Sequence, residues 1–173
     1  MKIREKNVNM ATLLLSATLF FPSLAVAQHE GKSQGYVFGS LGKVYGYSDT
    51  RLGAGIGFER LFDPGVGVGL DFQGFGALTE YSSTYGGIVF TANGSYHLRN
   101  VVSSGKLVPF GTFGYSGLAV CDSSCGGISG FNFGGGINYW FKPNRGLRVE
   151  FRDHVYTEYT SQQNWEFRTG FSF

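Results

Sequence analysis

The sequence is poor in charge and in proline, and both shortages limit the class of fold. Charged residues make up only 15% of the 173 residues, against about 25% in an average soluble domain. Prolines number 4, whereas glycines number 28 and aromatic residues reach 17%. Glycine weakens helix interiors, and aromatic rings pack well on pleated surfaces. The composition therefore favours strands and turns over helices, within the single domain that this length allows.

A large excess of positive charge is also lacking. The 14 basic and 12 acidic side chains give a formal net charge of +2. Lys2, Arg4 and Lys6 lie among the first ten residues together with Glu5, so the remaining chain has 11 basic and 11 acidic groups and no net charge. Without a basic patch, the composition argues against nucleic acid as a partner.

The first 27 residues have the three-part organisation of a secretory signal peptide. Residues 1–10 are polar and basic, residues 11–21 are apolar, and Ala25 and Ala27 supply an A-x-A cleavage motif. We expect cleavage after Ala27, which leaves residues 28–173 as the mature domain. An uncleaved membrane anchor is the alternative, but a spanning helix needs about 20 apolar residues. This apolar stretch is shorter and is followed by Pro22.

Beyond Ala27 the sequence has no long apolar run, so we predict no membrane-spanning helix there. The mature domain is then either a soluble secreted domain or a protein that crosses a membrane as strands. Only helices and closed barrels satisfy every backbone N–H and C=O group inside lipid. The strand pattern therefore becomes the deciding feature.

Apolar and polar residues alternate with period two, as the strands of a membrane barrel require. In residues 66–74, valine, leucine and phenylalanine alternate with glycine, aspartate and glutamine. Two further segments, residues 35–44 and 108–118, mix glycine with aromatic residues on both faces, and we predict strands there without assigning their faces. The clearly alternating segments are residues 52–60, 66–74, 88–98, 131–141, 147–155 and 165–173.

Eight segments of roughly 9–11 residues match the strand length that crosses a bilayer at a tilt. We therefore predict an all-β fold, an eight-stranded antiparallel up-and-down transmembrane β-barrel. A secreted β-sandwich is the alternative, because its strands alternate too, but the even strand count and the aromatic residues near strand ends favour the barrel. Residues 62–65, 99–107 and 142–146 would face the periplasm. The outside loops would be residues 45–51, 77–86, 119–129 and 156–164.

The last segment, WEFRTGFSF, carries an apolar ring at four alternate positions: Trp165, Phe167, Phe171 and Phe173. It resembles the C-terminal signal by which the barrel-assembly machinery recognises its clients. Residues 147–156, LRVEFRDHVY, followed by a loop and this strand, are similar to the usual ending of such proteins. From about residue 34 to the last residue, the chain resembles the small eight-stranded OmpA/OmpX/OmpW-like outer-membrane β-barrel family. The resemblance implies a bacterial outer-membrane location, with outer-membrane lipids and the assembly machinery as partners, and says little about activity.

Charged residues gather on the predicted lumen face. Buried charges must be paired, and an eight-stranded barrel is just wide enough inside for side chains to fill. We therefore expect a paired network that fills the lumen, with a catalytic or ion-conducting site as the alternative. A hairpin centred near residue 160 would set Arg152 opposite Arg168 and His154 opposite Glu166. The expected network is Glu59, Asp71, Arg148, Glu150, Arg152, Glu166 and Arg168.

No catalytic, cofactor or metal motif stands out. The three histidines, His29, His97 and His154, are scattered without metal-ligand spacing. The stretch that follows His154 departs from the His-x-Ser-Asn pattern of the lipid A deacylase family. We expect no cofactor, no metal and no enzymatic activity, but a structural or surface-contact role. A small passive solute channel and a lipid-modifying enzyme remain the alternatives.

Cys121 and Cys125 are the two cysteines of the chain. The signal peptide routes the chain through an oxidising compartment, where disulfides persist. We therefore expect a small disulfide that closes the third outside loop. A metal or redox pair is the alternative, but no histidine lies nearby in the sequence.

Overall fold

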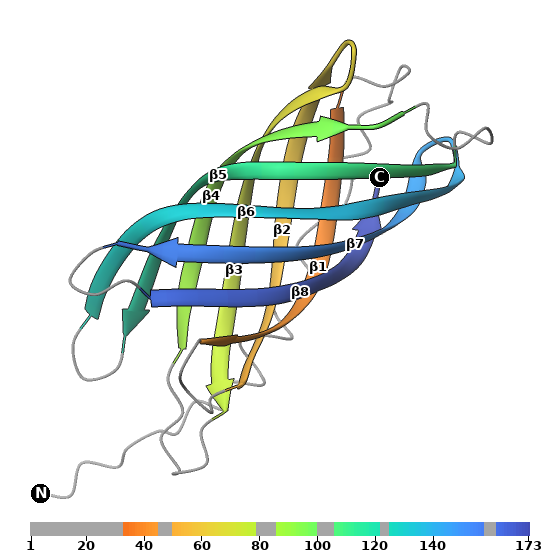
Figure 1. Ribbon diagram of the computed structural model, residues 1–173. Coiled ribbons are helices and arrows are strands. Elements are labelled where there is room, and N and C mark those ends of the chain that lie inside the picture. Colours follow the sequence, from red (N-terminus) through yellow and green to blue (C-terminus); the bar gives the residue numbers. More distant parts are fainter. Residues whose placement is uncertain (1–32, 45–49, 79–85, 100–105, 122–124, 158–161) are drawn as a thin grey trace, which may run out of the picture.

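Eight antiparallel strands form a closed barrel in which β1 pairs with both β2 and β8 (Figure 1). The computed structural model describes residues 33–44, 50–78, 86–99, 106–121, 125–157 and 162–173. The predicted fold is thereby confirmed, while the predicted signal peptide lies outside the described residues. The strands are β1 (Ser33–Val44), β2 (Thr50–Phe62), β3 (Val66–Leu78), β4 (Gly86–His97), β5 (Leu107–Cys121), β6 (Cys125–Lys142), β7 (Arg145–Tyr156) and β8 (Gln162–Ser172).

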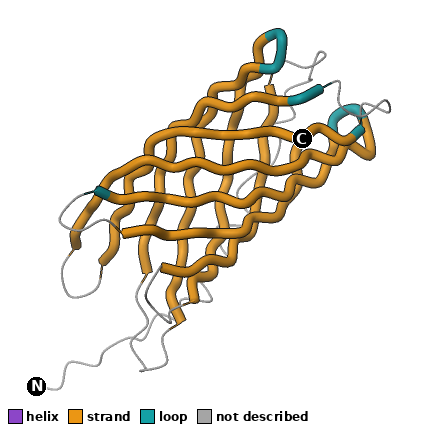
Figure 2. Tube along the Cα trace, viewed as in Figure 1, coloured by secondary structure: helices purple, strands orange, loops and turns teal. Residues whose placement is uncertain are grey.

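Of the described residues between strands, all but Thr157 lie at one end of the barrel, which we call the turn end (Figure 2). They are the turn between β2 and β3, the two residues between β6 and β7, and the described parts of the link between β4 and β5. Gly65 reverses the chain with a φ of 137°, and a Cβ there would lie 2.4 Å from the His97 carbonyl oxygen. We call the opposite end the loop end. No helix in the described ranges is long and apolar enough to cross a membrane.

The predicted connections all include residues that belong to strand ends, and the largest difference is between β5 and β6. Residues 119–129 were expected to be a loop, but β5 continues to Cys121 and β6 begins at Cys125, so most of this range is strand. Arg145 and Gly146 were expected in a turn and instead begin β7. The small residues of the first range pair directly across the strands, Ala119 with Gly127 and Val120 with Gly126. Because glycine has no side chain, these strand ends show no polar and apolar alternation.

The outward face of the barrel is apolar around its circumference. Phe72 on β3, Phe90 on β4 and Phe113 on β5 are each about half exposed or more. Soluble monomers rarely expose a contiguous apolar patch larger than a few hundred Å². This surface instead suits contact with lipid acyl chains, where every backbone polar group must be paired within the barrel. The closed barrel also excludes the β-sandwich alternative.

The inward face is mostly polar. The structure also shows which residues of β1 and β5 face the lumen. Tyr36 and Phe38 of β1 are buried in the lumen, while Val37 and Leu41 point outward. On β5, Phe110 is buried inside. Both faces of these strands carry apolar residues because rings fill part of the lumen. The alternation therefore could not distinguish the two faces.

Placing a charge on the outward face tests whether this surface contacts lipid. We predict that Phe72→Arg, in the middle of β3, lowers the free energy of unfolding in lipid vesicles by about 2–4 kcal/mol. Val66→Arg lies at the turn end of the same face and is the matched control, with an expected cost of about 0–1 kcal/mol. Denaturant titration of both variants measures the difference. Equal costs at the two positions would show that this face does not cross a bilayer.

Candidate functional site

A buried ion-pair cluster lies at the centre of the lumen, built on β3, β7 and β8. Arg152 Nη1 lies 2.5 Å from Asp71 Oδ2, and Arg168 Nη1 lies 3.3 Å from the same oxygen. Arg152 also donates from Nε to Glu150 Oε1 at 2.8 Å. The Asp71 residue is only 1% exposed. A charge this deeply buried requires partners of opposite sign, and each of these groups has at least one.

The cluster extends toward both ends of the barrel. Toward the loop end, Arg168 forms an ion pair with Glu166. Toward the turn end, Arg148 lies 3.1 Å from Glu150 and 3.5 Å from Glu59. These pairs place all seven residues expected for the lumen network in one connected set, which we call the lumen network.

The pairing between β7 and β8 differs by two residues from the predicted register. Arg152 lies opposite Glu166, not opposite Arg168, and Glu150 lies opposite Arg168. His154 lies opposite Asn164. The observed register sets opposite charges directly across from each other, which is the favourable arrangement for cross-strand neighbours. A shift of two residues keeps every side chain on its original face.

Neutral polar groups complete the hydrogen bonding of the carboxylates. Asp71 accepts hydrogen bonds from Tyr36, from Thr91 Oγ1 at 2.7 Å and from Asn93 Nδ2 at 2.9 Å. Gln73 Nε2 donates to Glu166 at 3.0 Å. Gln73 was expected on the lumen side, but its hydrogen bond to the network was not predicted from the sequence. Tyr36 was missed because its strand had no assigned face.

Aromatic rings fill the lumen around the arginines. The Arg148 guanidinium carbon lies 4.4 Å from the Tyr36 ring centre and 3.9 Å from that of Phe110. Arg168 lies 4.6 Å from the Phe38 ring centre. Gly57 provides the space for Tyr36, because a Cβ on this glycine would lie 2.3 Å from the ring. The interior is therefore packed with side chains, as expected for eight strands.

Ser116, His154 and Glu166 form a hydrogen-bonded chain that resembles a nucleophile, base and acid in its connectivity. Ser116 Oγ lies 2.9 Å from His154 Nδ1, and His154 Nε2 lies 3.1 Å from Glu166 Oε1. Asn132 Nδ2 also donates to Ser116 Oγ at 2.9 Å. Sequence spacing gave no signal for this chain, because its members come from three different strands.

The described side chains leave little room beside these three hydrogen-bonded residues. Ser116 is 0% exposed. A buried apolar cluster lies toward the loop end of the lumen, and we call it the apolar cap. The cavity beside His154 has a volume of about 20 Å³, which is room for about one water molecule. The members of the apolar cap are Phe75, Val89, Leu118 and Tyr156, with Val120 and Ile128 packed against them.

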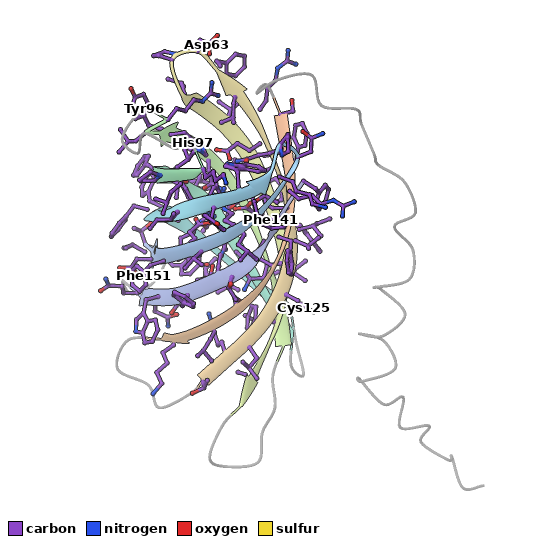
Figure 3. All side chains as sticks on the ribbon, turned by 90° about the vertical axis from the view of Figure 1, so that its right-hand side faces the viewer. Asp63, Tyr96, His97, Cys125, Phe141 and Phe151 are labelled. Atoms are coloured by element: carbon purple, nitrogen blue, oxygen red, sulfur yellow. The ribbon has the colours of Figure 1, made fainter. Side chains whose placement is uncertain are left out.

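One carboxylate lies on the outward face of β7, where the sequence analysis expected only apolar residues. Asp153 is 6% exposed and accepts a hydrogen bond from Gln163 of β8. It lies opposite Phe133 on one side and Trp165 on the other. The neighbouring Phe151 points away from the barrel wall (Figure 3). A carboxylate that faced lipid would carry a free-energy cost, and the low exposure of Asp153 shows that its neighbours shield it from that contact.

The remaining predicted site residues lie away from the lumen network. The strand register sets Cys121 directly opposite Cys125, and Cys125 lies well away from Asp63 at the turn end (Figure 3). Their disulfide stays a prediction. The four rings of the expected assembly signal, Trp165, Phe167, Phe171 and Phe173, all face outward, between 37% and 58% exposed. Their role in assembly also stays a prediction. The described residues contain no group of His, Cys, Asp and Glu suited to a metal ion.

Breaking the centre of the lumen network tests its contribution to stability. We predict that Arg152→Ala lowers the free energy of unfolding by about 3–5 kcal/mol, because Asp71 and Glu150 lose a buried partner. Arg60→Ala is the matched control, since Arg60 is exposed on the outward face of β2. The melting temperature of both variants in detergent measures the effect. An unchanged melting temperature for Arg152→Ala would contradict a stabilising network.

Comparisons with known proteins agree with the architecture. No protein-family model and no curated protein matches the sequence. Among solved structures, Neisserial surface protein A is similar, with a TM-score of 0.60, 12% identity and coverage of 81% of this chain and 94% of that chain. The outer membrane protein OprG from Pseudomonas aeruginosa gives a TM-score of 0.58, 12% identity and coverage of 82% and 94%. The N-terminal β-barrel domain of Pseudomonas aeruginosa OprF gives a TM-score of 0.56 and 15% identity, with coverage of 83% of this chain and 100% of that chain.

At these identities the likeness concerns the fold. The strand count, the closure of β1 on β8 and the apolar exterior agree with that likeness. The chain has the fold of the small eight-stranded outer-membrane β-barrels.

Proposed function

We propose that this protein is a non-enzymatic barrel of a bacterial outer membrane, with a sealed lumen and a structural or surface-contact role. The lumen network is the observation that carries this proposal. It connects β2, β3, β7 and β8 across the interior, and its members are nearly all buried. An apolar exterior and a filled, ion-paired interior are the properties of a barrel that holds its shape in lipid and passes no solute.

The arrangement of charge argues against a passive channel. A conducting pore needs polar groups that face water and remain available to the passing ion. Here the Asp71 carboxylate is engaged by two arginines, a tyrosine and a threonine. The apolar cap lies between the lumen network and the loop end. A solute would have to displace both sets of side chains.

The same geometry argues against an enzyme. The Ser116, His154 and Glu166 chain has the connectivity of a catalytic relay, but a buried serine beside a cavity for one water cannot admit an ester. Glu166 is also held by Arg168. This chain of hydrogen bonds is better explained as part of the lumen packing.

The two ends of the barrel differ in a way that supports a surface role. Two tight turns, between β2 and β3 and between β6 and β7, lie at the turn end, which we place in the periplasm, and this leaves the loop end outside the cell (Figure 2). Strands β5 and β6, with 15 and 18 residues, are the longest described strands, and they meet at the loop end. One of the similar structures is that of a protein named as a surface protein. The loop end is therefore the part of this barrel that we assign to contact with the surroundings.

Planar-bilayer recording tests the sealed lumen. We expect the purified wild-type barrel to add no conductance to the bilayer, because its interior is filled by paired charges and by the apolar cap. Heat-modifiable gel mobility of the same sample controls for correct folding. Reproducible single-channel steps from the folded barrel would favour the passive channel and overturn the sealed lumen.

Epitope labelling of intact cells tests the orientation and the surface role. A tag inserted between Cys121 and Cys125 should bind antibody on intact cells, since this connection lies at the loop end. A tag inserted between Pro143 and Asn144, in the turn between β6 and β7, is the matched control and should bind only after permeabilisation. Labelling of the second tag on intact cells would reverse the proposed orientation.

A further inference from the structure

Arg51 is an inward-facing arginine near the loop end of β2, and it is not among the seven residues predicted for the lumen network. Its guanidinium carbon lies 4.5 Å from the centre of the Phe75 ring in the apolar cap. With the Asn164 amide oxygen turned toward it, Arg51 Nη1 donates to that oxygen at 3.1 Å. Among the described residues, the buried Nε of Arg51 has no hydrogen-bond partner. A buried donor left without an acceptor costs free energy, so a ligand that accepts a hydrogen bond from this N–H would stabilise the barrel.

A small cavity lies against this arginine. Its volume is about 20 Å³, and it is partly enclosed by residues of β1, β2, β3, β4, β7 and β8. A cavity needs about 10–15 Å³ to hold a water molecule, and the water needs two to four polar partners. This cavity meets both requirements, and it is too small for a larger ligand. Its polar lining residues are Ser40, Arg51, Gln73, His154, Asn164 and Glu166.

The charge count of the lumen points to the same residue. The lumen network contains four carboxylates but only three guanidinium groups. With uncharged imidazoles, it would carry one excess negative charge in a buried place, where an uncompensated charge is costly. The two histidines need not supply the missing charge. His97 Nε2 lies 3.0 Å from Glu59 Oε1, a contact that an uncharged imidazole makes by donating its N–H. A neutral His154 likewise satisfies both of its contacts, by donating to Glu166 and accepting from Ser116.

We propose that Arg51 is the fourth cation of the lumen network and that the cavity binds a single water molecule joining it to Glu166. The water accepts a hydrogen bond from Arg51 Nε and donates to the Glu166 carboxylate. A cation there would be repelled by Arg51 and an anion by Glu166, so a neutral ligand with both donors and acceptors fits best. This inference rests on the proposed sealed lumen, since it explains how the network is neutralised beneath the apolar cap.

Nuclear magnetic resonance of the full barrel in detergent micelles tests the bound water. Selective labelling of arginine makes the Arg51 Nε–H observable, and the Arg51→Lys variant, which lacks this group, assigns its signal. We expect a cross-peak between Arg51 Nε–H and a long-lived water molecule. A folded barrel whose Arg51 Nε–H shows no such cross-peak would overturn the water site.

A double-mutant cycle tests the role of the charge. Arg51→Gln and Glu166→Gln should each lower the denaturant midpoint of unfolding. In the double variant the midpoint should fall by less than the sum of the two single shifts. The control cycle combines Glu166→Gln with Arg60→Gln on the outward face, where the shifts should add. Arg51→Lys keeps the positive charge, so its denaturant midpoint should lie between those of the wild type and Arg51→Gln.

Additive shifts in the Arg51 and Glu166 cycle would overturn the coupling. That failure is distinct from failure of the sealed lumen, which would show as conductance by the wild-type barrel. A non-conducting barrel with additive shifts removes only the inference on Arg51.

Discussion

The constraint on which this structure depends is that lipid offers no hydrogen bonds to the backbone. An open sheet would leave the edges of β1 and β8 with unsatisfied polar groups, each costing several kcal/mol. The pairing of β1 with β8 removes both edges, from Tyr36 with Ser172 to Val44 with Asn164. Closure then determines the interior. Eight strands enclose a space that side chains must fill, and the inward positions carry charges and rings that fill it together.

The lumen network is the consequence of putting polar residues on the inside of such a barrel. The exterior must be apolar, so the alternation of the strands directs the polar residues inward. Once inside, each charge needs a partner, and long arginine side chains from β7 and β8 reach across the interior to Asp71 on β3. Contacts of this kind tie strands that are not neighbours in the sheet. The barrel wall is thus held by backbone pairing around it and by ion pairs across it.

The sequence was sufficient for the fold and for the seven ion-paired residues of the network, but not for its geometry, its neutral partners or Arg51. Period-two alternation distinguishes the two faces of a strand, so it located Asp71, Glu150 and Arg152 inside. It cannot distinguish a register from another register shifted by two residues, because both keep every side chain on the same face. The error in pairing β7 with β8 has this origin. Asp153 and the glycine-rich ends of β5 and β6 were missed because each departs locally from the alternation.

The unequal length of the strands gives the barrel a rim of uneven height. Pairing of β6 with β7 reaches only to Gly130 and Tyr156, whereas β6 continues with β5 to Cys125. At the loop end the wall formed by β5 and β6 therefore stands taller than the neighbouring β7. A partner that binds the extended ends of β5 and β6 would therefore contact the rim from one side only.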